Sequence, residues 1–375
     1  MGYICISVTS PFISTTIFVF SFGASTHVPP LFIFSSLLVP INIIAGAVFP
    51  VLSSYTSTLS GPPTNPRSIT TFVPSPLNST FDFEIIENVS KENLINKLPN
   101  FDAISLRVIK LDSDIISKCK NLKIISRHGV GYDNVDLNSL KLNNITLAIT
   151  ASANAISVAE HAMFMILSIS KGIDMYDSAV RRGQFLKKDK YSKTFELWNK
   201  NFLIVGFGRV GKILIKRCLG FEMKVYVYDP FVDEKTIESL GGIKVSDFNG
   251  SLKNMDYISI HMPLTDKTKN LINSSNLKTM KKNSIIVNTS RGGIINEKDL
   301  DEALNKEFIF GAGLDVFEKE PPDTNNPLLT NKKVLLSPHS STFTEECTER
   351  MGKETIQNII DFFDGKLDQS MVVQL

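Results

Sequence analysis

A glycine-rich turn between an apolar strand and a helix constrains the fold of this chain more than any other feature. The strand Phe202–Val205 leads directly into the sequence GFGRVG, and sequence typical of a helix follows over Lys212–Cys218. Gly206 permits the tight turn, Gly208 lets the backbone approach a pyrophosphate, and Gly211 permits close packing of the helix on the strand. The amides at the helix start would hold the phosphates. The segment predicts a dinucleotide-binding β-α-β unit.

A carboxylate stands where the second strand of such a unit ends. The strand Lys224–Tyr228 is followed by Asp229, 18 residues after Gly211 (229 − 211). A carboxylate at this place accepts hydrogen bonds from the adenosine ribose hydroxyls and would repel a 2′-phosphate. Pro230 and Phe231 come next, with no arginine beside them. The sequence therefore predicts NAD as the cofactor, in preference to NADP.

Length, charge and cysteine content limit the remaining classes. The 375 residues suffice for two domains, and a net charge of +2 lacks the basic excess of a nucleic-acid-binding protein. The four cysteines (Cys5, Cys119, Cys218 and Cys347) lie far apart, without the paired spacing of a zinc site. We expect a cytoplasmic protein from a reducing compartment, with no metal and no nucleic-acid partner.

The N-terminal segment 1–66 differs from the rest of the chain because it contains no Lys, Arg, Asp or Glu. Its stretch 28–52 is almost wholly apolar and long enough to span a bilayer, although four prolines would interrupt a spanning helix. The segment is either a membrane anchor or extraneous sequence from a start codon placed too far upstream. We favour the second interpretation and place residues 1–66 outside the expected fold.

After residue 67, short apolar strands alternate with helical sequence, which predicts a mostly parallel sheet with helices on both faces. The expected strands are 83–86, 103–106, 122–126, 202–205, 224–228, 257–261, 284–288, 310–314 and 334–337. Helices are expected over 91–97, 113–118 and 344–362, with Asp112 or Ser113 as an N-cap.

A further helix is expected to start at a capping box, Ser157-Val158-Ala159-Glu160. Its continuation over 162–169 is apolar on nearly every side, so the helix should be buried all round. Either a subunit interface or the centre of one large domain would supply this burial.

Three polar side chains each follow the carboxyl end of a predicted strand, the edge where open α/β sheets bind ligands. Arg291 lies in the sequence NTSRGG, whose paired glycines leave room for a ligand beside a guanidinium that can grip a carboxylate. Glu320 follows 313–317, and His339 follows 334–337. A histidine beside a carboxylate gains basicity and a fixed tautomer, so the set suggests proton-transfer catalysis.

These segments resemble the D-isomer-specific 2-hydroxyacid dehydrogenases, the family of D-3-phosphoglycerate dehydrogenase and the hydroxypyruvate and glyoxylate reductases. The resemblance extends over residues 67–375 and is carried by 127–136 (RHGVGYDNVD), 157–161, 206–211, 288–293, 314–322 and 337–339. It implies a Rossmann-type NAD-binding domain inserted into a smaller, flavodoxin-like substrate domain. The expected parts are 67–150 and 339–375 for the substrate domain and 151–338 for the NAD-binding domain.

The resemblance also implies a role for each site residue. Arg291, Glu320 and His339 are the catalytic set, in which Arg291 binds the substrate carboxylate and carbonyl and Glu320 pairs with His339, the acid/base. The expected cofactor-binding residues are Gly206, Gly208, Arg209, Val210, Gly211, Asp229, Met262, Thr289 and Asp315, of which Thr289 and Asp315 line the nicotinamide end. Amides around Val130 and Gly131 would grip the substrate carboxylate. A homodimer through the helix near Ser157 is implied as well.

The expected reaction transfers a hydride between NAD(H) and a D-2-hydroxy acid and 2-oxo acid pair. Glyoxylate, hydroxypyruvate and 3-phosphohydroxypyruvate all fit, because each carries a carboxylate for Arg291. Two departures matter: the stretch 106–110 (LRVIK) differs from the loop that many phosphoglycerate enzymes use near the phosphate, and Ser340-Ser341-Thr342 lacks a glycine common there. A NAD-sensing binding protein or corepressor on the same fold is the alternative.

Overall fold

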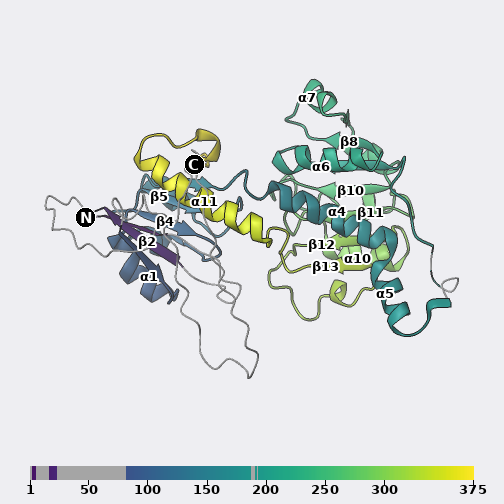
Figure 1. Ribbon diagram of the computed structural model, residues 1–375, viewed down its shortest axis with the longest axis horizontal. Coiled ribbons are helices and arrows are strands. Elements are labelled where there is room, and N and C mark those ends of the chain that lie inside the picture. Colours follow the sequence, from purple (N-terminus) through teal and green to yellow (C-terminus); the bar gives the residue numbers. More distant parts are fainter. Residues whose placement is uncertain (1, 6–16, 23–81, 187–190, 192) are drawn as a thin grey trace, which may run out of the picture.

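The computed structural model describes residues 2–5, 17–22, 82–186, 191 and 193–375 (Figure 1). In these residues the strands form a six-stranded and a seven-stranded sheet. Figure 1 shows the first sheet at the purple and blue end of the molecule and the second at the green end. The predicted α/β class is confirmed, since both sheets are largely parallel and carry helices.

The second sheet is parallel throughout and follows the order β13-β12-β11-β10-β7-β8-β9. The chain starts in the middle at β7, moves outward to one side, and then returns to fill the other side from β10. The strand order therefore reverses between β7 and β10, the place where such sheets bind dinucleotides. The strands are β7 Asn201–Val205, β8 Lys224–Tyr228, β9 Ile243–Lys244, β10 Tyr257–Ile260, β11 Ile285–Asn288, β12 Gly311–Leu314 and β13 Val334–Leu336.

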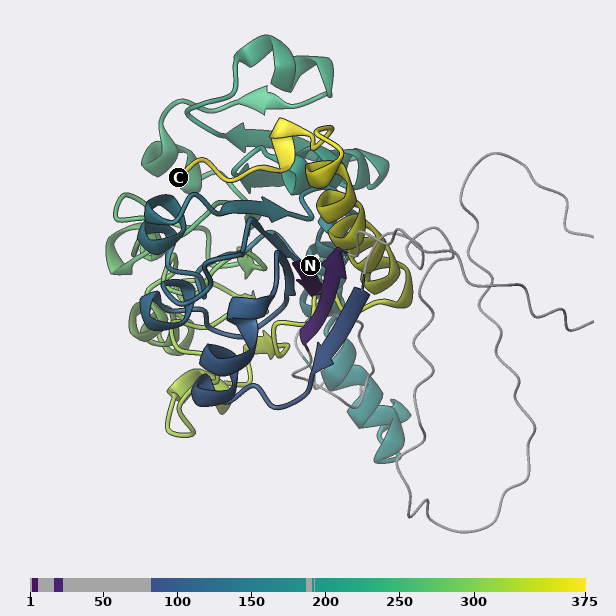
Figure 2. The same ribbon diagram turned by 90° about the vertical axis from the view of Figure 1, so that its left-hand side faces the viewer.

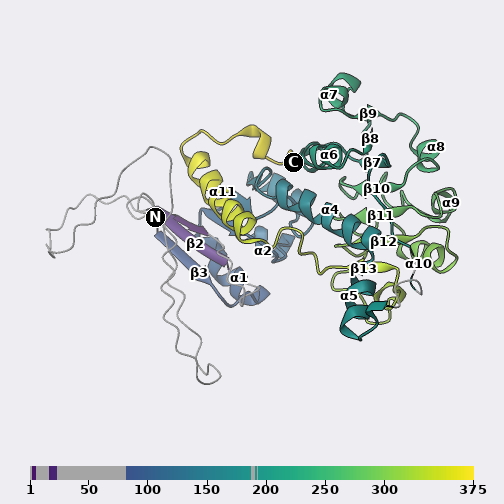
Figure 3. The same ribbon diagram turned by 45° about the vertical axis from the view of Figure 1, so that its right-hand side comes forward.

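Alternating side chains of this sheet build two separate cores. Phe202 and Ile204 of β7 pack with helices α4 and α6, whereas Leu203 and Val205 pack with the helices of the opposite face. Burial on both faces explains why the central strands are apolar at most positions. Figure 3 shows the second set of helices along one side of the sheet. The helices are α4 Ala155–Lys171, α5 Ile173–Arg181, α6 Arg209–Gly220, α7 Glu234–Ser239, α8 Phe248–Leu252, α9 Ser274–Leu277 and α10 Glu297–Asn305.

The first sheet has the order β3-β2-β1-β4-β5-β6. Without β2, its strands follow the flavodoxin-like order; β2 is inserted between β3 and β1 and runs antiparallel to both. The strands are β1 Gly2–Cys5, β2 Ile17–Phe22, β3 Asp82–Ile86, β4 Ala103–Leu106, β5 Ile124–Arg127 and β6 Thr146–Ile149. Placing all of residues 1–66 outside the fold is therefore wrong for β1 and β2. Absence of charge was a poor criterion, because a strand joins a sheet through its backbone.

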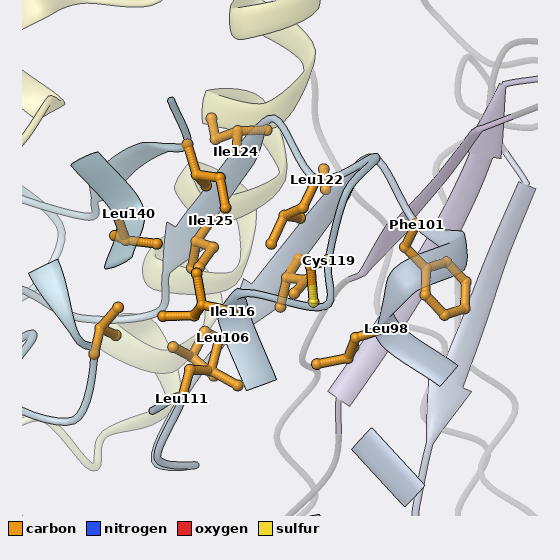
Figure 4. Packing of buried hydrophobic residues seen from close by; sticks show 14 of the residues in the cluster. Leu98, Phe101, Leu106, Leu111, Ile116, Cys119, Leu122, Ile124, Ile125 and Leu140 are labelled. Atoms are coloured by element: carbon orange, nitrogen blue, oxygen red, sulfur yellow. The ribbon is translucent and has the colours of Figure 1, made fainter. Parts of the chain in front are cut away.

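The C-terminal helix returns to the first sheet, as the resemblance implies. Helix α11 packs on β4, β5 and β6, its residue Ile359 is part of the core, and the amide of Val373 donates to the carbonyl of Leu147 (2.9 Å). Figure 2 shows α11 beside the first sheet, and Figure 4 shows the core beneath it. The helices are α1 Lys91–Lys97, α2 Ser113–Ile116, α3 Leu137–Leu142 and α11 Glu345–Phe363.

Helix starts depend on partners that the local sequence does not show. Asp112 caps α2 as predicted, accepting a hydrogen bond from the amide of Ile115. The capping box at Ser157 is wrong: α4 begins at Ala155, and the Ser157 hydroxyl donates to the carbonyl of Ser341 (2.6 Å). A buried hydroxyl needs a partner, and this one finds it in a distant loop. Burial all round is also wrong for the single chain, in which Phe164 is 53% exposed.

In the described part of the chain, no single helix is long and apolar enough to cross a membrane. The bent pair α4 and α5 passes the same criteria of length and composition only when the two helices are taken together. The apolar stretch 28–52, which motivated the membrane interpretation, lies outside the described residues.

Candidate active site

The glycine-rich turn after β7 is packed so closely that two of its glycines have no room for a side chain. Gly206 has a left-handed backbone (φ +95°), and a Cβ there would lie 2.5 Å from the carbonyl oxygen of His261. A Cβ on Gly211 would lie 2.5 Å from the carbonyl oxygen of Gly206. The two glycines thus allow β7, helix α6 and the segment that follows β10 to pack closely, as expected for these positions.

The third glycine, Gly208, is the N-cap of α6 and faces open space, since a Cβ there would have no neighbour within 4 Å. No side chain caps this helix, and Arg209 and Val210 form its first turn. An uncapped helix start with an open approach suits an anion such as a pyrophosphate. The Arg209 guanidinium donates to the carbonyl of Ser370 (3.2 Å), which links this turn to the C-terminal segment.

Asp229 follows β8 and holds the same turn. One of its carboxylate oxygens accepts a hydrogen bond from the amide of Phe207 (2.8 Å), and the other accepts one from the amide of Phe231 (2.8 Å). Each carboxylate oxygen can accept a further bond. The geometry fits a dinucleotide, because the carboxylate can brace the glycine-rich turn and still receive ribose hydroxyls.

Buried polar atoms without partners mark the neighbouring edge of the sheet. Among the described residues, Thr289 Oγ1 and His261 Nδ1 are buried and make no hydrogen bond. Buried polar groups of this kind usually find a partner, so they fit a cofactor with polar groups at this edge. Met262 follows β10 and is partly buried in the core beside them.

The structure places His339 and Glu320 in direct contact. Nδ1 of His339 lies 2.7 Å from Glu320 Oε2, and the other carboxylate oxygen accepts a hydrogen bond from the amide of Phe317 (3.1 Å). The bond to Glu320 raises the pKa of His339, while burial opposes the shift. Burial acts to raise the pKa of Glu320, but the hydrogen bond and charge of His339 outweigh it and the pKa is lowered. Together these shifts favour an imidazolium paired with a carboxylate.

Arg291 joins this pair from the loop after β11. Its charge acts on both His339 and Glu320, and its Nε donates to Asp133 Oδ2 of the other domain (3.1 Å). A Cβ on Gly131 would lie 2.0 Å from Arg291 Nη2, so a side chain at this position would displace the guanidinium. The predicted catalytic set and the Gly131 turn are therefore brought together from four loops and two domains.

Two further guanidinium groups, which the sequence analysis did not select, share this region. Burial lowers the pKa of Arg127 to about 10, and the charges of Arg291 and Arg107 act in the same direction. Asp133 is the opposing acid at Arg127. Among the groups that act on Arg127, two arginines are opposed by one acid, so this region carries a net positive charge that favours an anionic ligand. Arg127 stands first in the quoted RHGVGYDNVD motif, so its place in that motif was the available signal.

Backbone amides complete the substrate side. In the described part of the chain, the amides of Val130 and Gly131 donate no hydrogen bond, whereas the amide of Gly129 bonds to Thr150 Oγ1 (2.7 Å). Gly129 itself has a positive φ of +132°. The turn thus presents two free donors beside Arg291.

Among all the residues that the structure describes, no group of His, Cys, Asp and Glu side chains could hold a metal ion.

The doubly wound sheet, its closely packed glycine turn and the polar side chains gathered at one edge are typical of one class, the two-domain, dinucleotide-binding oxidoreductases. Sequence comparison gives the family. The family described as "D-isomer specific 2-hydroxyacid dehydrogenase, NAD binding domain" matches residues 163–341. The chain belongs to the D-isomer-specific 2-hydroxyacid dehydrogenases, as the motifs predicted.

Relatives with known names agree with this placement. The chain is 37% identical to D-3-phosphoglycerate dehydrogenase of Methanocaldococcus jannaschii, over 79% of this chain and 56% of that protein. It is also 37% identical to hydroxypyruvate reductase of Thermotoga maritima, over 73% of this chain and 88% of that protein. The chain thus spans about half the length of the first relative and most of the second.

A solved structure is similar as well. D-lactate dehydrogenase from Aquifex aeolicus, complexed with NAD and lactic acid, has 29% sequence identity and a TM-score of 0.65. The match covers 72% of this chain and 86% of that one.

Proposed function

We propose that this chain is an NAD-dependent enzyme that interconverts a D-2-hydroxy acid and its 2-oxo acid. The observation that carries the proposal is the contact of His339 with Glu320 (2.7 Å), on both of which the charge of Arg291 acts. A proton donor with a raised pKa and a carboxylate-binding guanidinium are the two groups that reduction of a 2-oxo acid requires.

In the direction of reduction, Arg291 and the amides of Val130 and Gly131 hold the substrate carboxylate. Protonated His339 donates its proton to the C2 carbonyl oxygen, which becomes the hydroxyl oxygen, and Glu320 stabilises the imidazolium before the transfer. NAD, held by the 206–211 turn, Asp229, Met262 and Thr289, supplies the hydride chemistry when bound. Fixing both reactants between two domains supplies much of the rate, because the encounter is already oriented.

The three arginines favour a small 2-oxo acid that carries at least one negative charge, with hydroxypyruvate, glyoxylate and 3-phosphohydroxypyruvate as the candidates. The test is NADH oxidation, followed by absorbance, with these acids and with acetone as an uncharged control. Chiral chromatography of the product from hydroxypyruvate should give the D isomer. A purified, folded protein that oxidises NADH with none of the acids would contradict the proposal and favour a binding protein.

Asp229 predicts the choice of cofactor. NADH should be preferred over NADPH by at least ~10-fold in kcat/KM, because one repelled or lost charge contact is worth about 1.4 kcal/mol or more. Asp229→Ala should narrow this ratio by weakening NADH more than NADPH. Its effect on the turn at Phe207 acts on both cofactors, so the ratio is the quantity to measure. Equal rates of wild type with both cofactors would refute the assignment.

We also propose a homodimer that forms through α4 and α5. These helices leave Ile156, Phe164, Ile173 and Val180 exposed by 42% to 54%, a surface that a second copy would cover. Light scattering at micromolar concentration should give twice the chain mass.

We propose that the protein is located in the cytoplasm, which three buried free cysteines (Cys119, Cys218 and Cys347) support. We also propose that it has no nucleic-acid partner, which the net charge supports. The domain limits at 150 and 338 remain our proposal, supported by the two sheets.

A further inference from the structure

Helix α4 reaches the loop that carries His339 through a short series of hydrogen bonds. His161 Nε2 lies 2.9 Å from the hydroxyl oxygen of Ser337, and that hydroxyl donates to Asp315 Oδ1 (2.5 Å). His161 lies in the second turn of α4, and 18% of its side chain is exposed. None of these contacts belongs to the cofactor, substrate or acid–base groups assigned above, apart from Asp315.

The bond from Ser337 to Asp315 decides the donors and acceptors in the rest of this series. A serine hydroxyl has one proton, and an ionised carboxylate can only accept. Since the Ser337 proton points to Asp315, the oxygen of Ser337 accepts from His161, which must carry its proton on Nε2. Asp315 is the charged group that faces His161, with Oδ1 at 3.7 Å from Nε2.

The same carboxylate holds the backbone on both sides of His339. Asp315 is fully buried and accepts hydrogen bonds from the amides of Ser340 (2.8 Å) and Ser341 (3.0 Å) in addition to the Ser337 hydroxyl. The amide of His339 donates to the backbone carbonyl of Asp315 (2.8 Å). These bonds bracket a residue with φ +51°, a left-handed conformation that a non-glycine residue adopts only when its surroundings require it.

We propose that His161 is a positioning residue: by donating to Ser337 it fixes the Asp315-centred loop and thereby aims the His339 ring at Glu320. The inference rests on the proposed function in taking His339 as the proton donor. It also changes the role expected for Asp315, whose carboxylate is engaged by the catalytic loop.

Glutamine and phenylalanine at position 161 separate the hydrogen bond from the packing. His161→Gln keeps an N–H group near the place of Nε2, whereas His161→Phe keeps a ring of similar shape and removes the donor. Ser337→Ala removes the middle of the series without altering α4. His161→Phe and Ser337→Ala should each lower kcat by about 10-fold, with a smaller effect on the KM for NADH, and the double variant should be no worse than either alone.

The decisive readout is the titration of the His339 ring by NMR, which needs no turnover. The chain has five histidines, and His339→Ala identifies the resonance of interest. Glu320, Asp315 and Arg291 are the charged groups that face this ring. The pKa of His339 should fall in His161→Phe, because the ring turns away from Glu320, and should stay near that of wild type in His161→Gln.

An unchanged pKa of His339 in both His161→Phe and Ser337→Ala would overturn the inference. Equal loss in His161→Gln and His161→Phe would also overturn it, by assigning the effect to ring packing. If wild type reduces no 2-oxo acid, the proposed function fails, yet the NMR titration still decides whether His161 orients His339.

Discussion

Replacing His339 by alanine is expected to lower kcat for reduction of the preferred 2-oxo acid by ~10²–10⁴-fold. The reason is that we propose His339 as the group that protonates the forming hydroxyl, and the contact with Glu320 (2.7 Å) raises its pKa. The measurement is the steady-state rate of NADH oxidation at saturating substrate.

Binding of NADH provides the control for this variant. The residues assigned to the cofactor are on other loops, so the dissociation constant measured by NADH fluorescence should stay within a few-fold of wild type. A kcat within threefold of wild type would assign the proton to another group. Loss of NADH binding together with kcat would show that the substitution disturbs the fold of the loop.

Replacing Arg291 by lysine should lower kcat/KM by about 10- to 100-fold, mainly through a higher KM for the 2-oxo acid. A lysine keeps the charge but cannot form two parallel hydrogen bonds to a carboxylate, and one charge-assisted hydrogen bond is worth about 1.5–3 kcal/mol. It also cannot keep the bond to Asp133 while it holds the substrate, so some loss of kcat from misorientation is expected.

Two variants frame this result. Arg217→Lys changes an arginine that pairs with Glu160 away from the site, and it should leave kcat/KM unchanged. Gly131→Ala keeps the arginine itself but puts a methyl group where the guanidinium of Arg291 lies. This variant should therefore also raise the KM for the 2-oxo acid. A KM for Arg291→Lys equal to that of wild type would remove Arg291 from the substrate carboxylate.

Local signals were sufficient to select the residues of the glycine-rich turn and of the proposed catalytic set. The functions of Gly206 and Gly211 depend on backbone geometry within one β-α-β unit, and the structure shows the close contacts that such a unit needs. Arg291, Glu320 and His339 could be selected because strand ends in a parallel sheet share one edge. The pairing of His339 with Glu320 follows from this shared edge together with the family resemblance.

Partners that lie far apart in the chain could not be predicted. Ser157 has the local pattern of a capping box, yet its hydroxyl bonds to Ser341, 184 residues away. His161 stands next to that pattern and gives no local sign of its contact with Ser337. The bond between Arg291 and Asp133 joins two domains, and only their packing creates it.

The measurement that tests the central claim most directly is the pH profile of kcat/KM for reduction in wild type and Glu320→Gln. In the proposed mechanism reduction needs protonated His339, so activity should fall as the pH rises through the pKa of His339. The hydrogen bond to Glu320 raises this pKa. With glutamine the imidazolium loses its charged partner and its pKa drops. The basic limb should therefore move to lower pH in Glu320→Gln, and a limb that does not move would contradict the pairing of Glu320 with His339 as the acid–base unit.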